Sequence, residues 1–144
     1  MMRVCLGSDH AGYDLKCYLT GWLKRSGYEV VDKGPFGPES VDYPDFAHSV
    51  ANAVQQKEAP LGILICGSGN GVCISANKHD GIRAALCWNV AIASLARQHH
   101  DANIACLPAR FISRNMARNI VKAFLTAEFE GGRHAVRVNK IPCK

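Results

Sequence analysis

One stretch of the chain, from Leu61 to Lys78, carries residues that could bind and transform an anion. It opens with a short apolar run at 61–65, which is typical of a strand buried on both faces and is closed by Cys66. The turn Gly67-Ser68-Gly69-Asn70-Gly71 follows, and then residues that can start a helix. Glycines let a backbone approach a ligand closely, and free N–H groups at a helix N-terminus attract negative charge. The same dipoles favour the thiolate form of a cysteine, so Cys66 is a candidate base or nucleophile.

Two plainer interpretations of this stretch stay open. The glycines of a strand-to-helix turn can serve steric needs alone, and a cysteine is often simply packed in a core. The spacing excludes two nucleotide sites, because no Gly-Lys-Ser/Thr follows and because the glycines do not match G-x-G-x-x-G. A small anionic ligand, or an anionic intermediate, therefore fits this turn better than a nucleotide.

Titratable side chains also follow other predicted strands. Asp9 and His10 come directly after a strand at 3–7, and Arg110 follows a strand at 103–107. Ligands of open α/β sheets bind beyond the carboxyl ends of the strands. We therefore expect one group to gather at or near this edge: Asp9, His10, Cys66, His99, His100 and Arg110. Two alternatives stay open, namely that Ser8 or Asp9 only caps the next helix and that the paired histidines only cap the end of theirs.

Three residues elsewhere are candidates for ligand contact. Tyr43 stands where a loop at 33–43 meets a helix, and binding residues are common in such loops. Arg133 and Arg137 lie four residues apart near the C-terminus, so a helical turn would present both guanidinium groups on one side. The alternative for the two arginines is a solvated basic face.

The elements that must position these residues alternate between strand and helix. Strands are predicted at 3–7, 28–32, 61–65, 82–87 and 103–107, and helices at 13–26, 44–57, from 72 onward, 89–98, 113–127 and 133–137. Such alternation indicates a parallel sheet with right-handed crossovers. The predicted fold class is α/β, a Rossmann-like three-layer αβα sandwich with a five-stranded parallel sheet and a C-terminal helical tail, in one domain over 1–144. Leu95 and Met116 are among the helical side chains expected to face the core.

The composition narrows the classes of partner and compartment. With 48% apolar and 20% charged residues, no apolar run of membrane-span length and no signal-peptide pattern, we expect a soluble protein that is neither exported nor inserted into a membrane. Seven cysteines without a C-x-x-C pair suggest a reducing cytoplasm. From Arg97 onward nine Lys/Arg stand against three acids, which favours a phosphorylated small molecule, because no aromatic residues are interleaved for nucleic-acid stacking.

Taken together, these features resemble the type B ribose-5-phosphate isomerase family, which also contains the galactose-6-phosphate isomerase subunits and allose-6-phosphate isomerase. The resemblance covers nearly the whole chain. It rests on five blocks in the family's order: residues 7–12 with Leu15-Lys16; Asp42-Tyr43-Pro44; residues 65–71 with Ala76-Asn77-Lys78; Arg97-Gln98-His99 with Asp101 and Asn103; and residues 131–134 with Arg137.

The resemblance implies an aldose–ketose isomerase without a metal or other cofactor, which interconverts ribose 5-phosphate and ribulose 5-phosphate through an enediolate in the non-oxidative pentose phosphate pathway. It implies Cys66 as the base, Ser68 as a carrier of protons between O1 and O2, and His99, assisted by Asp9, as the acid that opens the furanose. The implied phosphate ligands are His10, Arg110, Arg133 and Arg137. The full set of implied substrate-binding residues is Asp9, His10, Tyr43, Gly67, Ser68, Gly69, Asn70, Gly71, His100, Arg110, Arg133 and Arg137.

Three positions distinguish this chain within the family. Members that lack the cysteine carry a glutamate where Val72 stands, so this chain resembles the cysteine type. His100 stands where the family usually has asparagine, and Pro108 where it usually has glycine. These two departures bear on the contact to the sugar and on the approach to Arg110, and leave the implied catalytic groups in place.

The family also implies a homodimer, with a dimer of dimers left open, whose subunits share their active sites. The basic tail is the expected donor of the shared residues, and no nucleic acid or membrane partner is expected. Two other functions stay open: a phosphohexose isomerase of the same family, and a non-catalytic α/β module that senses sugar phosphates or nucleotides.

Overall fold

The computed structural model describes residues 1–143. Its strands are β1 (Arg3–Ser8), β2 (Glu29–Asp32), β3 (Leu61–Cys66), β4 (Ala84–Leu86) and β5 (Ile104–Pro108). Its helices are α1 (Tyr13–Arg25), α2 (Tyr43–Gln55), α3 (Asn70–Ala76), α4 (Val90–His100), α5 (Arg114–Thr126) and α6 (Arg133–Val138). The predicted order of strands and helices is confirmed, with boundaries that differ by up to two residues at most ends.

The five strands form one parallel sheet in the order β2-β1-β3-β5-β4. From β1 the chain passes first to β2 on one side and then to β3 on the other, so the topology switches between β1 and β3. In doubly wound folds, ligands bind at the carboxyl ends of the strands at such a switch point. The fold therefore singles out the segments after Ser8 and Cys66, the last residues of these two strands.

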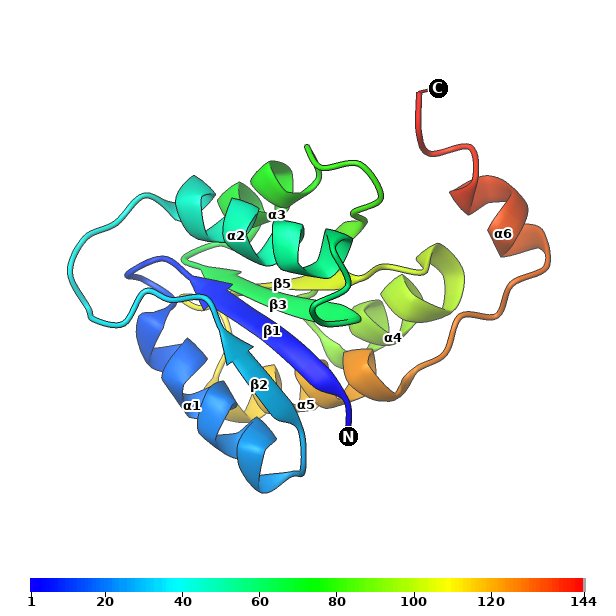
Figure 1. Cartoon of the computed structure of the whole chain (residues 1–144). Coiled ribbons are helices and arrows are strands. Elements are labelled where there is room, and N and C mark those ends of the chain that lie inside the picture. Colours follow the sequence, from blue (N-terminus) through cyan, green and yellow to red (C-terminus); the bar gives the residue numbers. More distant parts are fainter. Residues whose placement is uncertain (144) are drawn as a thin grey trace.

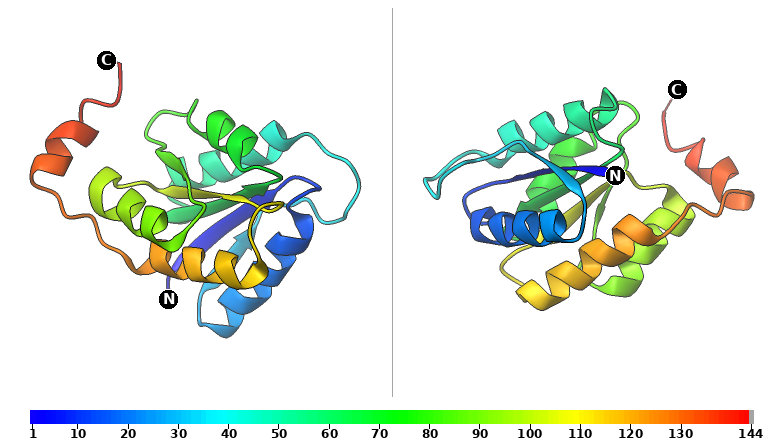
Figure 2. Two further views of the ribbon diagram at one scale, coloured as in Figure 1. Left: turned by 180° about the vertical axis from the view of Figure 1, so that it is seen from behind. Right: turned by 60° about the horizontal axis from the view of Figure 1, so that its bottom comes forward.

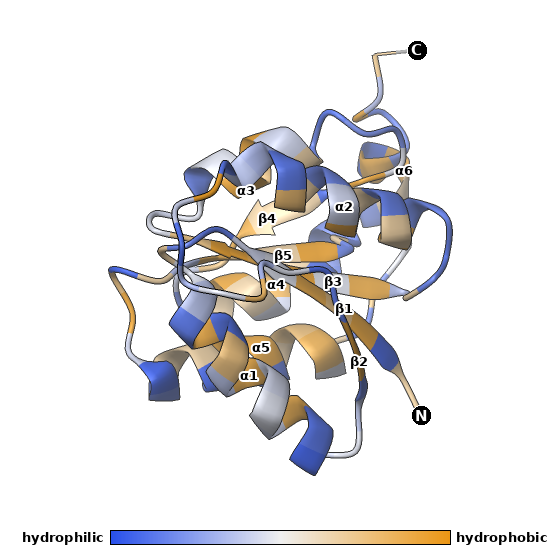
Figure 3. Ribbon diagram, turned by 60° about the vertical axis from the view of Figure 1, so that its left-hand side comes forward, coloured by the Kyte–Doolittle hydropathy of each residue, from blue (hydrophilic) through white to orange (hydrophobic). Residues whose placement is uncertain are grey.

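Helices cover both faces of the sheet and give the predicted three layers. Figure 1 shows α2 and α3 on one face and α1, α4 and α5 on the other. Each face has its own apolar core, one containing Phe124, Leu19 and Ile63 and the other Val50, Leu64 and Val72, all fully buried. The apolar colouring of the central strands in Figure 3 follows from this, because a sheet covered on both sides needs apolar residues on both faces.

Two helical side chains predicted to face the core lie at the surface instead. Leu95 of α4 is 39% exposed and Met116 of α5 is 37% exposed. On α4 the fully or nearly fully buried residues are Ala93 and Ala96, so this helix meets the core through small side chains. Small side chains carry a weak signal in a hydrophobic pattern, and the prediction for Leu95 was therefore wrong about the buried face.

The chain beyond α5 is an extended linker, 127–132, that leads to the short helix α6. Figure 2 shows this segment running past the end of α4, with α6 standing apart from the sheet in both views. The Glu130 N–H donates to the Gln98 carbonyl at 3.0 Å, which attaches the linker to the last turn of α4. Among the described residues, no helix has the length and apolar content to cross a membrane.

Candidate active site

A pocket of about 460 Å³ opens at the carboxyl edge of the sheet, at the switch between β1 and β3. We call it the glycine-turn pocket; its lining residues are Asp9, Tyr43, Cys66, Gly67, Ser68, Gly71, Arg110 and Phe111. Seven of these eight were predicted as site residues, and the structure brings them together. The eighth, Phe111, was missed: its side chain is 75% exposed, and its only signal in the sequence is its place next to Arg110.

Cys66 ends β3 and lies at the base of this pocket with 5% of its surface exposed. Its carbonyl accepts a hydrogen bond from the Ala109 N–H at 2.9 Å, and the next carbonyl, of Gly67, accepts from the Arg110 N–H at 3.0 Å. The segment after β5 is thereby fastened to the segment after β3. As a result, the Arg110 side chain passes directly over Gly67, where a Cβ would lie 3.2 Å from a guanidinium nitrogen.

The glycines of the turn are required sterically as well. Gly69 has φ +78°, and a Cβ there would lie 2.5 Å from Leu86 Cδ1. A Cβ on Gly71 would lie 2.6 Å from Cε1 of the Tyr43 ring. The steric interpretation of this turn is thus correct, and it does not compete with the functional one, because the same close packing builds the pocket wall.

Backbone N–H groups of the turn remain for a ligand. The first hydrogen bond of the helical turn is donated by the Cys73 N–H to the Gly69 carbonyl, so the N–H groups before it have no helical partner. Ser68 Oγ accepts from the Asn70 N–H at 3.3 Å and from Asn70 Nδ2 at 3.2 Å. These bonds hold the Ser68 hydroxyl at the rim of the turn, and its own proton is available for donation.

Asp9 supports the turn before α1 and also lines the pocket. One carboxylate oxygen, Oδ1, accepts the Gly12 N–H at 3.0 Å. Gly12 itself is the N-cap of α1 and no side chain within residues 1–143 caps this helix, so the capping alternative for Ser8 and Asp9 was wrong. The side chain also lines the pocket and is 8% exposed. The Asp9 N–H donates to the Ile65 carbonyl at 3.1 Å, which places the carboxylate beside the end of β3.

His10 lies on the outer side of the same loop and contacts the loop at 33–42. Its Nδ1 is 3.2 Å from both the N–H and the carbonyl oxygen of Val41, so either protonation state of that nitrogen finds a partner. Lys16, buried within α1, donates to both oxygens of Asp32 at 2.7 and 2.8 Å, and Asp32 accepts the Gly34 N–H at 2.8 Å. This ion pair fixes the start of the loop at 33–42, which His10 contacts.

Three other buried cysteines differ from Cys66 in their surroundings. Burial raises the pKa of Cys5 and of Cys87 to about 12, and raises that of Cys106 well above its ordinary value. These three thiols are fully buried, and their raised pKa favours the protonated form. Cys73 is half-buried, and a hydrogen bond with Cys106 lowers its pKa, so it is the nearest rival thiol to Cys66.

The expected position of His99 and His100 was wrong. They end α4, which returns the chain from the carboxyl end of β4 to the amino end of β5. At that edge the Arg83 Nε donates to the His100 carbonyl at 3.1 Å, and the Gly62 N–H donates to the Asn103 carbonyl at 2.9 Å. Within one chain, both histidines therefore lie at the edge of the sheet opposite to Cys66. In Figure 1 the strand arrowheads and the cyan loop at 33–42 lie on one side, and α6 lies on the other.

His99 belongs to a second group of side chains, which we call the tail cluster: His99, Glu130, Arg133, His134 and Arg137. The imidazole rings of His99 and His134 stack with centroids 4.1 Å apart and an angle of 9° between their planes. Glu130 Oε1 lies 3.8 Å from Nε2 of His99 and 3.5 Å from Nε2 of His134. Burial, followed by the positive charges of His99 and the two arginines, lowers the pKa of His134, and Glu130 opposes that shift.

Three members of the tail cluster, His99, Glu130 and His134, offer metal-ligand atoms within 4.8 Å of one another. The sequence spacing had not revealed this set. A metal ion requires ring nitrogens whose in-plane lone pairs converge on it. The two rings are nearly parallel, so their lone pairs run side by side, and this arrangement suits a carboxylate bridge better than an ion.

Three arginines have guanidinium groups without a hydrogen-bond or ion-pair partner in the described part of the chain. Arg110, in the glycine-turn pocket, and Arg133 and Arg137, in the tail cluster, are all exposed, and no hydrogen bond or ion pair is made by their guanidinium groups within residues 1–143. Other arginines are engaged; Arg97, for example, pairs with Asp101 at 3.0 Å. The chain therefore offers anion-binding groups at both edges of the sheet.

Comparison with known proteins finds close relatives along the whole chain. The family model described as Ribose/Galactose Isomerase matches residues 4–141. Ribose-5-phosphate isomerase B of Escherichia coli K12 is 45% identical over 141 residues, covering 98% of this chain and 95% of that protein. The structure of ribose-5-phosphate isomerase B from Clostridium thermocellum matches with a TM-score of 0.96 at 53% identity, covering 97% of this chain and 95% of that one. The structure of ribose-5-phosphate isomerase B from Mycoplasma genitalium with bound ribulose-5-phosphate matches with a TM-score of 0.93 at 46% identity, covering 97% of this chain and 93% of that one.

Proposed function

The chain belongs to the ribose/galactose isomerase family, and we propose that it interconverts ribose 5-phosphate and ribulose 5-phosphate through an enediolate. The observation that carries this function is the nearly buried thiol of Cys66 under a glycine turn, with Asp9, Ser68 and Arg110 around the same pocket. An aldose–ketose isomerisation needs one base that reaches two adjacent carbons and a cradle for the negative charge that develops on oxygen. The pocket supplies both.

In the proposed reaction the Cys66 thiolate removes the proton from C2 of the open-chain aldose. The electron pair of the broken C–H bond forms the C1–C2 double bond, and the carbonyl pair moves onto O1. Backbone N–H groups from Gly67 to Gly71 stabilise that oxygen. The Ser68 hydroxyl helps to carry the proton of O2 to O1, and the Cys66 thiol then returns its proton at C1 to give the ketose.

Ribose 5-phosphate is mostly a furanose, so its ring has to open first. The proposed acid is His99, which donates a proton to O4 as the C1–O4 bond breaks. The proton of the O1 hydroxyl leaves at the same time toward Asp9, and the C1 aldehyde forms. Asp9 lies in the glycine-turn pocket and His99 in the tail cluster, so this step joins two groups that one chain holds apart.

We therefore propose that a second copy of the chain completes each active site, as a homodimer with shared sites. The tail cluster of one subunit would bring His99, His100, Arg133 and Arg137 to the glycine-turn pocket of the other. Exposed apolar side chains next to this cluster support such a contact, among them Leu95 and Val136, at 39% and 58% exposure. A cytoplasmic location is proposed because all seven cysteines are free, which suits a reducing compartment.

The phosphate group is assigned to His10, Arg110, Arg133 and Arg137, and to test this assignment we choose Arg137→Ala. A charge-assisted hydrogen bond is worth about 1.5–3 kcal/mol, so the KM for ribose 5-phosphate should rise roughly tenfold to a hundredfold, with a smaller change in kcat. Steady-state kinetics checks this. Lys140→Ala removes the same charge from the same exposed tail and should leave KM unchanged. Equal behaviour of the two variants would assign Arg137 to a solvated basic face.

The contact between Gly71 and Tyr43 gives a test of the pocket wall. Gly71→Ala places a methyl group where Cε1 of Tyr43 would be 2.6 Å away, so the ring has to move. Displacing a group that contacts substrate by about 1 Å can cost roughly a hundredfold in rate, and we expect kcat/KM to fall about tenfold or more. Tyr43→Ala in the same background removes the clash, so the two substitutions should be strongly non-additive in a double-mutant cycle. An unchanged kcat/KM for Gly71→Ala would remove Tyr43 from the proposed site.

The proposed function is tested by assaying ribose 5-phosphate, allose 6-phosphate and galactose 6-phosphate side by side. The highest kcat/KM is expected for ribose 5-phosphate. A clear preference for a six-carbon substrate would make the chain a phosphohexose isomerase of the same family. Binding of ribose 5-phosphate without turnover would identify a sensor instead.

A further inference from the structure

We propose that Glu130 and His134 are positioning residues for His99, which hold its imidazole with Nε2 toward the Glu130 carboxylate and leave Nδ1 for the sugar. The inference rests on the proposed function, because it concerns the ring-opening step. Neither residue lines the glycine-turn pocket.

The backbone fixes Glu130 beside His99. The Glu130 N–H donates to the carbonyl of Gln98, the residue before His99, at 3.0 Å. This bond ties the linker to the last turn of α4, and the carboxylate then reaches Nε2 of His99 at 3.8 Å. A histidine at the end of a helix has a freely rotating side chain unless something holds it, and here a carboxylate faces one specific nitrogen.

His134 closes the arrangement from the other side of the ring. Gly131 and Gly132, with φ +68° and +57°, turn the chain back on itself, and the His134 N–H donates to the Gly131 carbonyl at 3.1 Å. The turn lays the His134 ring on that of His99, 4.1 Å away and 9° from parallel. Stacking limits rotation of the His99 ring, since rotation would break the overlap.

The charges around the stacked rings favour a neutral His134. Burial and the neighbouring cations lower the pKa of His134, so its neutral form is favoured next to a second imidazole. The Glu130 carboxylate can then compensate a positive charge on His99, which is the form that an acid needs. The other titratable or charged groups of these segments are Arg97 and His100 on α4, Asp101 directly after it, and Arg133 and Arg137 on α6. Of these, Asp101 pairs with Arg97 and with Arg83.

Glu130 and His134 serve a single proton transfer, the one by which His99 opens the sugar ring. His99 donates its Nδ1 proton to O4, the C1–O4 bond breaks, and the O1 proton leaves toward Asp9. A misdirected His99 would slow this step alone. Ribulose 5-phosphate has no ring of this kind to open, so removal and return of its C1 proton by Cys66 should not depend on His99.

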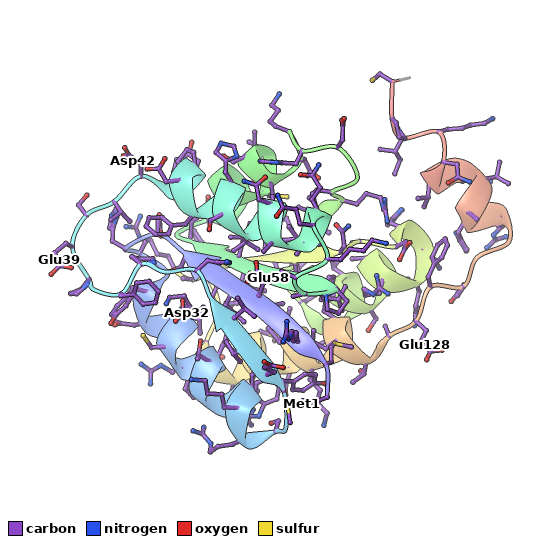
Figure 4. The ribbon with its side chains drawn as sticks, in the orientation of Figure 1. Met1, Asp32, Glu39, Asp42, Glu58 and Glu128 are labelled. Atoms are coloured by element: carbon purple, nitrogen blue, oxygen red, sulfur yellow. The ribbon has the colours of Figure 1, made fainter. Side chains whose placement is uncertain are left out.

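Two rates measured on the same enzyme test the inference. The first is the conversion of ribose 5-phosphate. The second is the exchange of the C1 protons of ribulose 5-phosphate for deuterium in D₂O, followed by NMR. The variants are Glu130→Gln and His134→Ala, with His134→Phe as a variant that keeps a stacked ring and lacks the nitrogens. Glu128→Gln is the matched control, because it removes the same charge from the same linker; Figure 4 shows the labelled Glu128 side chain pointing outward.

We expect Glu130→Gln and His134→Ala to slow ribose 5-phosphate conversion roughly tenfold to a hundredfold and to change the exchange rate less than about twofold. Glu128→Gln should change neither rate. Unchanged conversion in both variants would overturn the inference, and so would an equal loss of both rates, which indicates general damage to the site. If His134→Ala fails to fold, the inference is tested by the two rates of His134→Phe and Glu130→Gln instead. A wild-type protein that binds ribose 5-phosphate without converting it would instead overturn the proposed function.

Discussion

We expect Cys66→Ala to lower kcat for ribose 5-phosphate by about a hundredfold to ten-thousandfold, the range that positioned acid–base catalysis contributes. The helix after the glycine turn offers no carboxylate in place of the thiol. Val72, where the glutamate-type members of the family carry their carboxylate, is apolar and fully buried in the core between the sheet and α2 and α3. KM should change little, because the phosphate contacts are made elsewhere, and steady-state kinetics separates the two parameters.

The fold should survive this substitution. Cys66 is a small buried side chain at the end of a strand, and its truncation is expected to cost about 1 kcal/mol of stability, which thermal unfolding can check. Cys66→Ser should be nearly as inactive as Cys66→Ala, because a hydroxyl holds its proton too tightly to act as this base. Turnover near the wild-type level in either variant would contradict the mechanism and leave Cys66 with a packing role.

Alkylation gives an independent measure of the same thiol. Iodoacetamide should inactivate the enzyme through Cys66, and ribose 5-phosphate should protect it. Cys17 and Cys143 are exposed and will also react, and Cys73 is the half-buried rival, so the triple variant Cys17→Ser, Cys73→Ala, Cys143→Ser is the control. It should be inactivated at the same rate as the wild type. Protection of that variant from inactivation would assign the effect to one of these three cysteines.

The sequence predicted the glycine-turn pocket because each of its parts follows a strand. Asp9, Cys66 and Arg110 stand after β1, β3 and β5, and in a parallel sheet the ends of neighbouring strands meet at one edge. That β1, β3 and β5 are neighbours could not be predicted, since strand order depends on how the helices pack and leaves no local pattern. Phe111 was missed for a related reason: an exposed aromatic residue has no periodicity to reveal it.

The prediction failed where helices, rather than strands, carry the functional side chains. His99 ends a helix, and a crossover helix between parallel strands must return the chain to the amino edge of the sheet. The blocks of sequence that point to one reaction therefore end up at two edges of the same subunit. The stacking of His99 on His134 was equally hidden, because it depends on two glycines that turn the linker back toward α4.

The proposed site residues are divided between two edges of the subunit. We therefore expect a second large effect: activity should return when two inactive variants form mixed dimers. One variant is Cys66→Ala, which keeps its tail cluster. The other replaces His99, Arg133 and Arg137 by alanine and keeps its glycine-turn pocket. The three replaced side chains are exposed or partly exposed, so the fold of this variant should be intact, as circular dichroism and thermal unfolding can verify.

Each variant alone should show less than about a hundredth of the wild-type activity, because one lacks the base and the other lacks three charged contacts. After co-expression with two different affinity tags, half of the dimers are mixed and each mixed dimer has one complete site of two. The recovered activity should therefore be about a quarter of the wild-type value, and about half in purified mixed dimers. If instead each site lay within one chain, a mixed dimer would contain no complete site and no activity would return. Recovery thus depends on the tail cluster of one subunit reaching the Cys66 of the other, which is the proposed arrangement of the two separated clusters.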